Sequence, residues 1–283
     1  ILASPNAPTN HTTDWTGEES YYYTGNPNNW VSFAGFYWRI IRINGDGSIR
    51  MIYNGSDATG PATSGVDTQI GMSSFNSIND NYIYVGYMYE KDQLHGLKDS
   101  STVKGILDNW YLNNLTDEAE YINRNAGFCG DRILSSQSGM YVTIYEAETR
   151  IQNSNPDLKC EQIDIYTTID STTGNNALTY PIGLISADEA MFAGLPYTYN
   201  TGNKNNYLYT EQFYWTMTPK RYNGYPNNND QASIFRVGTN WELYGSSANW
   251  SAVGVRPVIN IKADTQITGS GTSTDPYTVV GAS

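Results

Sequence analysis

Charged residues are scarce in this chain of 283 residues, and positively charged ones are the scarcer kind. Only 16% of the residues are Asp, Glu, Lys or Arg, against about 25% in an average domain. The 28 acidic and 16 basic residues leave a net charge of −12, which repels phosphate backbones and argues against a nucleic-acid partner. No run of about 18 apolar residues is present that would predict a membrane-spanning helix.

Cysteine and histidine are almost absent. The two cysteines, Cys129 and Cys160, and the two histidines, His11 and His95, show no spacing that would form a structural zinc site. The cysteines fit one disulfide bond across a loop of about 30 residues, which would stabilise the fold by about 3–4 kcal/mol and imply an oxidising compartment. The other interpretation is a pair of buried free thiols.

Aromatic residues, glycine and asparagine are abundant instead. Aromatics make up 13% of the chain, with 24 tyrosines, and there are 26 glycines. This composition excludes a disordered chain, which would be rich in charge and poor in aromatics. Tyrosine offers a large contact area at low entropic cost and asparagine offers adaptable polar contacts, a combination typical of a binding surface. The alternative is that asparagine and glycine fill turns.

The strongest local pattern is a β-hairpin. Residues 35–43 and 48–53 are rich in β-formers and flank the turn sequence Asn-Gly-Asp-Gly at 44–47. Both strands carry apolar residues on both faces, so we expect the hairpin at the centre of a sheet. The turn lacks the acidic ligands that follow in an EF-hand, which argues against a calcium loop.

Helices are expected at three places. Apolar residues at helical spacing after a capping serine predict a helix over 101–114. A short helix is expected after Thr116, because acidic residues occupy its first turn. A capping box over 186–189 opens a third helix, which ends before Gly194.

Short apolar or alternating runs predict further strands at 82–85, 180–185, 214–219, 234–237 and 253–261. We expect the strand at 214–219 to end at its proline, because proline has no amide hydrogen for the strand ladder.

The chain is expected to contain one main domain over residues 21–263. Residues 1–20, with prolines and no periodicity, are expected to form a tail or a linker from an upstream segment. Residues 126–176 hold both cysteines and little periodicity, which predicts an insertion stapled by the disulfide. Residues 264–283 are expected to extend from the domain and pack on it or on a neighbouring copy.

Five segments follow one another in a recognisable order. They are the tryptophan-bearing hairpin at 38–53, the run from Ser101 to Asn114 that ends Leu-x-x-Trp-Tyr-Leu-Asn-Asn, Gly-Leu-Ile-Ser-Ala-Asp-Glu at 183–189, Tyr-Trp-Thr-Met-Thr-Pro at 214–219, and Gly-Val-Arg-Pro-Val-Ile at 254–259. Over residues 21–280 this order resembles a large group of bacterial surface domains from Firmicutes, which are similar to the formylglycine-generating-enzyme-like branch of the C-type lectin-like fold.

The resemblance implies a fold rather than an activity. It implies an α+β, C-type lectin-like architecture with mixed and antiparallel strands, a few short helices and long loops rich in tyrosine and asparagine. It further implies that the hairpin at 36–53 lies beside the strand at 253–261, and that Arg256 has a structural role at a strand end. Formylglycine-generating enzymes use cysteines in their C-terminal part, and residues 177–283 contain none.

The residues of an active site are missing from the sequence. Neither histidine lies near a nucleophile motif, so a hydrolytic triad is not predicted. Asp188 and Glu189 have a structural role as helix-opening residues, which leaves no pattern of paired carboxylates for glycoside hydrolysis. The Glu-Pro-Asn and Trp-Asn-Asp triplets of calcium-dependent lectins are also missing. We therefore predict no enzyme activity, no metal site and no cofactor.

Two segments between the expected framework strands, 221–230 and 240–251, are rich in Tyr, Trp and Asn. Exposed rings there would stack on a sugar or on a protein face. The alternative is that the tryptophans belong to the core and the asparagines form turns. The candidate ligand-binding residues are Tyr222, Tyr225, Asn227, Asn228, Asn229, Trp241, Tyr244 and Trp250.

The sequence thus predicts a non-enzymatic binding module or adhesin on the bacterial cell surface, which recognises an extracellular glycan or protein. Its net negative charge places neutral ligands before polyanionic ones. The alternative is a structural subunit of an extracellular filament or surface layer, in contact with other copies of itself.

Overall fold

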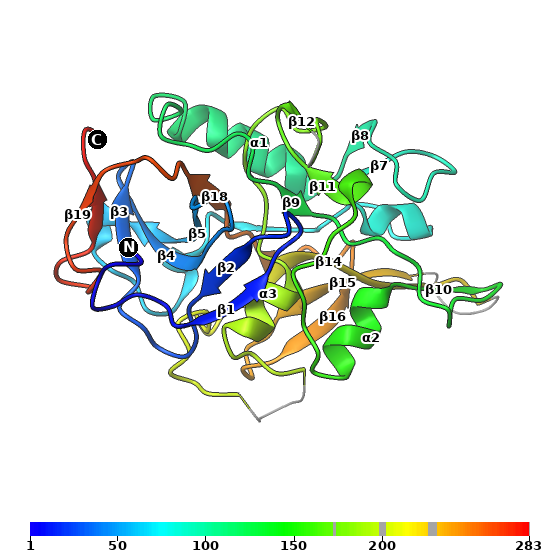
Figure 1. Cartoon of the computed structure of the whole chain (residues 1–283). Helices are drawn as coiled ribbons and strands as arrows, with labels where there is room; N and C mark the ends of the chain where they lie inside the picture. Colours follow the sequence, from blue (N-terminus) through cyan, green and yellow to red (C-terminus); the bar gives the residue numbers. More distant parts are fainter. Residues whose placement is uncertain (172–173, 198–201, 226–230, 283) are drawn as a thin grey trace.

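The computed structural model describes residues 1–171, 174–197, 202–225 and 231–282. Strands predominate and the helices are few and short, so the fold is of the α+β kind (Figure 1). Parallel and antiparallel pairs occur in both of the larger sheets.

The first sheet is built around the expected hairpin. Its eight strands are β1 (Asn10–Thr13), β2 (Glu19–Tyr22), β3 (Trp30–Phe33), β4 (Phe36–Ile43), β5 (Ile49–Ser56), β18 (Val258–Ile261), β19 (Ile267–Thr268) and β20 (Tyr277–Val279). One edge of β4 is shared by β3 and β2, and β5 covers the other edge. The hairpin is therefore central, as its two apolar faces predict.

The expected pairing of the hairpin with the strand at 253–261 is confirmed for residues 258–261, whereas Val253–Gly254 form the separate strand β17 of the second sheet. β5 and β18 run antiparallel, so that Ile52 lies opposite Val258 and Ile49 opposite Ile261. Because a strand buried on both faces needs hydrogen-bonding neighbours on both edges, this pairing satisfies the outer edge of the hairpin.

The two ends of the chain join the same sheet, where a tail or linker was expected over residues 1–20 and an extension packed on the domain or on a neighbouring copy over residues 264–283. Within residues 1–20, β1 pairs with β2, which continues the sheet from β4. The Asp14 carboxylate is buried and accepts hydrogen bonds from the Ser20 hydroxyl at 2.7 Å and the Gly45 amide at 3.0 Å. β20 pairs with β3 in parallel. Polar side-chain contacts of this kind have no periodic signature in the sequence.

The second sheet has six strands, which are β6 (Met72–Ser73), β10 (Val142–Ile144), β14 (Tyr214–Asn223), β15 (Gln231–Val237), β16 (Leu243–Ser247) and β17 (Val253–Gly254). The expectation that β14 ends at Pro219 is wrong. The β14–β15 register is irregular on both sides of Pro219, and this bulged pairing allows the strand to continue to Asn223.

Three two-stranded sheets complete the strands. They are β7 (Met88–Tyr89) with β8 (Asp99–Ser100), β9 (Phe128–Cys129) with β11 (Ile165–Tyr166), and β12 (Asp170–Ser171) with β13 (Gly174–Asn175).

Helices α1 (Thr102–Asn114) and α3 (Ala187–Phe192) begin at their expected caps. The Ser101 hydroxyl accepts a hydrogen bond from the Lys104 amide, and Ser186 and Glu189 form the expected capping box. A third helix, α2, spans Glu146–Gln152. The short helix expected after Thr116 is instead a series of turns.

The described residues include four short 3-10 helices, η1 (Asp57–Thr59), η2 (Val66–Thr68), η3 (Tyr82–Val85) and η4 (Gln162–Asp164). The strand expected at 82–85 is therefore wrong. The Asn81 side chain accepts a hydrogen bond from the Ile83 amide and caps η3, and this local bond favours a helical turn over an extended chain.

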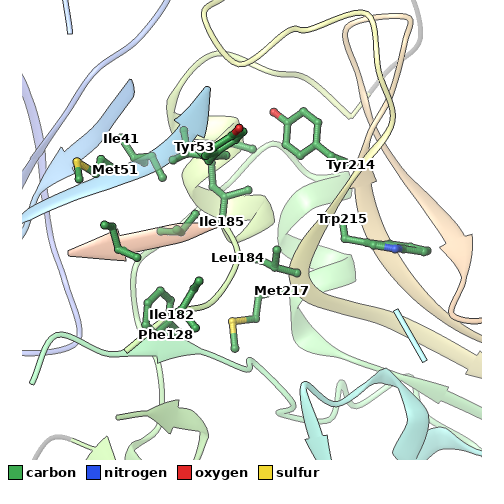
Figure 2. Packing of buried hydrophobic residues seen from close by; sticks show 14 of the residues in the cluster. Ile41, Met51, Tyr53, Phe128, Ile182, Leu184, Ile185, Tyr214, Trp215 and Met217 are labelled. Atoms are coloured by element: carbon green, nitrogen blue, oxygen red, sulfur yellow. The ribbon is translucent and has the colours of Figure 1, made fainter. Parts of the chain in front are cut away.

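One hydrophobic core joins the two large sheets. Figure 2 shows residues 182–185 between side chains of the first sheet, such as Ile41 and Met51, and of the second, such as Tyr214 and Trp215. The expectation of a strand at 180–185 is wrong, because the backbone of this segment divides its hydrogen bonds between the sheets. Its Gly183 pairs with Val258 of β18, whereas the Ile185 carbonyl accepts from Met217 of β14.

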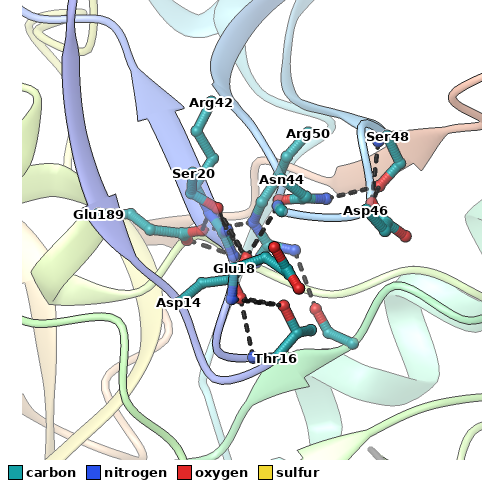
Figure 3. A network of polar contacts seen from close by, with 12 residues as sticks. Asp14, Thr16, Glu18, Ser20, Arg42, Asn44, Asp46, Ser48, Arg50 and Glu189 are labelled. Atoms are coloured by element: carbon teal, nitrogen blue, oxygen red, sulfur yellow. Dashed lines mark hydrogen bonds and ion pairs between the residues drawn. The ribbon is translucent and has the colours of Figure 1, made fainter.

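Helix α3 supplies a second, ionic connection. Figure 3 shows the buried Glu189 carboxylate between two buried guanidinium groups, with N–O distances of 2.9 Å to Arg42 and 2.5 Å to Arg50. Burial alone would raise the pKa of Glu189, but Arg50 and Arg42 hold it below its ordinary value. Because α3 also contacts β14, β15 and β16, this cluster fixes the helix between the sheets.

The expected disulfide is present. Cys129 and Cys160 are bonded, with Cα atoms 6.0 Å apart, and they are 31 positions apart in the sequence. Within the expected insertion at 126–176, Tyr145, Ile151 and Tyr166 belong to the common hydrophobic core. The segment is therefore packed as part of the same body. None of the helices in the described part of the chain is long and apolar enough to cross a membrane.

Candidate functional site

A group of aromatic rings surrounds one guanidinium group on the second sheet. The guanidinium carbon of Arg236 lies 4.1 Å from the ring centre of Phe213, 5.4 Å from that of Trp250 and 5.9 Å from that of Tyr244. The rings of Phe213 and Trp250 are themselves 5.3 Å apart. We call these four residues the aromatic strip.

Strand register and one loop contact bring the strip together. Arg236 on β15 lies directly opposite Tyr244 on β16. Phe213 precedes β14, and its carbonyl accepts a hydrogen bond from the Gly254 amide at 2.7 Å, which holds the loop carrying Trp250 close to it. Four elements that are separate in sequence therefore contribute to one surface.

The strip combines exposed rings with a buried cation. Tyr244 and Trp250 are 36% and 37% exposed, whereas Arg236 is 7% exposed beneath them. The Arg236 Nε atom donates a hydrogen bond to the Ser246 hydroxyl at 2.6 Å, which fixes the guanidinium plane. Half-exposed Trp and Tyr rings held in place by a stacked arginine suit stacking on the apolar face of a sugar or on a protein side chain.

Lys220 extends the strip along β14. Its ammonium nitrogen lies 5.3 Å from the Tyr244 ring centre and 3.7 Å from a carboxylate oxygen of the buried Glu148. Burial lowers the pKa of the Lys220 ammonium, and Glu148 opposes this effect. Arg221 also pairs with Glu148, so this acidic side chain binds two neighbouring basic residues of β14, of which Lys220 contacts the strip.

The tyrosines at the other end of β14 form a separate group. Tyr225 is 48% exposed, and its ring centre lies 5.6 Å from that of Tyr141. The Tyr222 hydroxyl donates a hydrogen bond to the Asp80 carbonyl at 3.0 Å, and this side chain is half-buried. The predicted Asn227, Asn228 and Asn229 lie outside the described residues.

Trp241 occupies the turn between β15 and β16. Its backbone φ of 61° lies in the left-handed region, and its half-buried ring lies 5.7 Å from that of Tyr209. The structure therefore brings Tyr244 and Trp250 together and places Tyr222, Tyr225 and Trp241 elsewhere.

Sequence reasoning missed Phe213, Arg236 and Lys220. The available signal was the basic residue in an otherwise apolar strand at 234–237, since a charged residue there needs solvent or a partner. The basic residue indicates that this position has a charged or polar environment, but the sequence does not reveal which aromatic rings contact its guanidinium group.

Other side chains that could take part in catalysis or ligand binding are paired with groups of the protein itself. The His95 Nδ1 atom lies 3.1 Å from Asp164, which also forms an ion pair with the buried Arg132. Arg256 is fully buried and donates hydrogen bonds to the Tyr53 carbonyl and the Asn54 side chain, as a structural arginine would. Within the described ranges, no cluster of three or more His, Cys, Asp or Glu side chains could hold a metal ion.

No protein-family model, curated protein or solved structure matches this chain in the comparisons made. Function is therefore argued from the geometry of the site.

Proposed function

We propose that this protein is a non-enzymatic binding module, an adhesin of the bacterial cell surface, which holds a neutral glycan or a protein ligand through the aromatic strip. The observation that carries the proposal is the pair of half-exposed rings, Tyr244 and Trp250, ordered around the buried Arg236. Preordered aromatic side chains lose little conformational entropy on binding, which is why they dominate many binding surfaces.

We further propose that the fold belongs to the C-type lectin-like class. Two features support this: the N-terminal hairpin pairs with the C-terminal strand β18, and connections with little regular structure carry exposed aromatics. The proposed extracellular location rests on the Cys129–Cys160 bond, because disulfides persist mainly in oxidising compartments.

The test begins with a glycan array and continues with single variants of the strip. Trp250→Ala and Tyr244→Ala are each expected to weaken binding of the array ligand by about tenfold or more, because each removes a central ring contact. Addition of a chelator is expected to leave binding unchanged, since stacking needs no metal.

Tyr225→Ala is the matched control, because Tyr225 is an exposed tyrosine of the same sheet region outside the strip. It is expected to retain wild-type affinity, and urea denaturation checks that all variants are folded. Retained affinity in both strip variants would remove the strip as the ligand surface. A protein that binds nothing but forms regular polymers would instead favour the filament or surface-layer subunit.

A further inference from the structure

A small polar cavity of about 260 Å³ lies apart from the aromatic strip, between β4 and the segment 204–211. Its lining includes Arg39, Lys204, Tyr207, Glu211 and Thr63. A cavity of this size is smaller than the roughly 300–1,000 Å³ that drug-sized ligands need, so it suits a ligand of about one monosaccharide.

The base of the cavity carries a buried positive charge. Arg39 is 4% exposed, and no carboxylate of the described residues lies within ion-pair distance of it. Its Nε atom donates to the Asn29 side chain at 2.6 Å and its Nη2 atom to the Pro27 carbonyl at 3.0 Å. These two bonds leave three of the five N–H groups of a guanidinium available.

Two aromatic rings hold the Arg39 guanidinium in place. Its central carbon lies 4.2 Å from the Trp30 ring centre and 5.1 Å from that of Tyr207. Burial lowers the pKa of Arg39 to about 9, with Tyr207 opposing the shift, so the group is still protonated at neutral pH. A charge that is buried, ordered and without a counterion is costly unless something compensates for it.

Tyr207, which also lines the cavity, carries an unused hydrogen-bond donor. It is 4% exposed, and its hydroxyl has no hydrogen-bond partner. Burial raises the pKa of this hydroxyl, so it keeps its proton and can only donate or accept as a neutral group. An unpaired buried hydroxyl costs free energy, which a ligand acceptor would recover.

The remaining charges near the cavity are distributed in favour of an anion at its base. Lys204 is exposed on the rim, and the fully buried Arg256 adds to the positive potential felt by Arg39. Glu211 is the acidic residue of the lining, and it is exposed to solvent. The overall negative charge of the protein is screened beyond about 8 Å at physiological salt, so these local groups decide the binding of a monoanion.

We propose that this cavity binds the carboxylate of one acidic sugar, of the uronic acid type, with the Arg39 guanidinium and the Tyr207 hydroxyl as its donors. A planar carboxylate matches the fork of guanidinium N–H groups better than a tetrahedral anion does. The exposed hydroxyl-bearing residues Thr63 and Ser64 also line the cavity and could bind sugar hydroxyls. The ligand class and the residues differ from those of the aromatic strip.

The experiment is calorimetric titration of the wild-type protein with glucuronate, glucose, acetate and inorganic phosphate. Saturable binding of glucuronate, weaker binding of acetate and no binding of glucose are expected. Phosphate bound more tightly than glucuronate would overturn the assignment to a carboxylate. Glucose bound as well as glucuronate, or no saturable binding of any probe at millimolar concentration, would overturn the anion site itself.

Tyr207→Phe is the decisive variant, because it removes the unpartnered hydroxyl and leaves the ring stacked on Arg39. It is expected to fold normally and to bind glucuronate about tenfold more weakly, the loss typical of one hydrogen bond to a charged group. Unchanged affinity would overturn the proposal. Lys204→Gln is expected to cause a smaller loss of about two- to fivefold, because this ammonium is exposed.

Two controls separate this site from other effects. Tyr166→Phe is the matched control, since Tyr166 is also a buried tyrosine beside an arginine and does not line the cavity. It is expected to bind glucuronate as the wild type does. Trp250→Ala is likewise expected to keep glucuronate affinity, so that failure of the aromatic strip as a ligand surface leaves this result unaffected.

Discussion

Asp131 and Asp188 share the side chain of Arg150 beside the disulfide. Their carboxylate oxygens lie 2.5 Å and 3.0 Å from the Arg150 Nη2 atom. Burial raises the pKa of the Asp131 carboxyl to about 7, because Arg150 offsets the desolvation only in part and Asp188 adds repulsion. A single arginine thus neutralises two buried acidic groups incompletely.

We expect this cluster to make the protein less stable as the pH rises through the weakly acidic range. A carboxyl whose pKa is raised on folding stabilises the folded state fully when the pH is below its ordinary pKa of 3.8. This stabilisation is lost as the pH rises to about 7. Asp131→Asn stays uncharged, so its stability relative to the wild type is expected to increase between about pH 5 and about pH 8. Urea denaturation over that pH series measures the difference.

The substitution suits the backbone, because Asp131 has a φ of 49° and asparagine tolerates the left-handed region well. The exposed Asp117 provides the control, since Asp117→Asn is expected to show a constant offset. A difference between Asp131→Asn and the wild type that does not change with pH would contradict the prediction. The acidic groups whose pKa values are lowered, such as Glu189 and Asp164, titrate at lower pH. They therefore do not contribute to the change in stability over the pH range of this experiment.

Among the elements, the pair β9 and β11 depends most directly on a covalent bond. Cys129 ends β9 and lies opposite Ile165 of β11, and its bond to Cys160 closes the intervening loop. Replacing both cysteines by alanine is expected to lower the free energy of unfolding by about 3–4 kcal/mol, mainly because the unfolded chain gains freedom. Thiol titration of the unfolded, non-reduced wild type is expected to find no free thiol, and finding two would contradict the bond.

Elements with a local cause could be predicted from the sequence. The hydroxyls of Ser101 and Ser186 bind amides three positions ahead, so each cap and its helix lie in one short segment. The turn at 44–47 likewise fixes its hairpin within a few residues. Such contacts need no knowledge of the rest of the molecule.

Elements whose partners are distant could not be predicted in the same way. Residues 182–185 show an apolar run, but the distribution of their hydrogen bonds depends on where β14 and β18 lie. The site follows the same pattern. Tyr244 and Trp250 were found by residue type alone, whereas the position of Arg236 beneath them depends on strand register and on the contact of Phe213 with Gly254.

At the scale of the whole molecule, we expect the two large sheets to unfold together. They share one core through residues 182–185, and Glu189 links α3 to Arg42 and Arg50 of the first sheet. Calorimetry is therefore expected to show one transition with equal calorimetric and van't Hoff enthalpies. Glu189→Gln removes the counterion of Arg50 and leaves Arg42 with Asp14, at 3.4 Å, so it should move this single transition downward, by about 3–5 kcal/mol in stability.

The exposed Glu120 offers the control, because Glu120→Gln removes the same charge without a buried partner and is expected to leave the transition in place. Two resolved transitions in the wild type, or splitting of the transition in Glu189→Gln, would show that the sheets are separate cooperative units.

The pairing of β3 and β5 with strands from the far end of the chain also determines when this protein can fold. Val31 of β3 pairs with Tyr277, and Ile52 of β5 pairs with Val258, so neither strand has its outer neighbour until more than 200 further residues have been synthesised. Until then the hairpin keeps an open edge, which is a template for pairing with other chains. Contacts so distant in sequence also slow folding, because a long loop must close before they form. The synthesis of β18 and β20 therefore sets the earliest moment at which β5 and β3 are protected from aggregation.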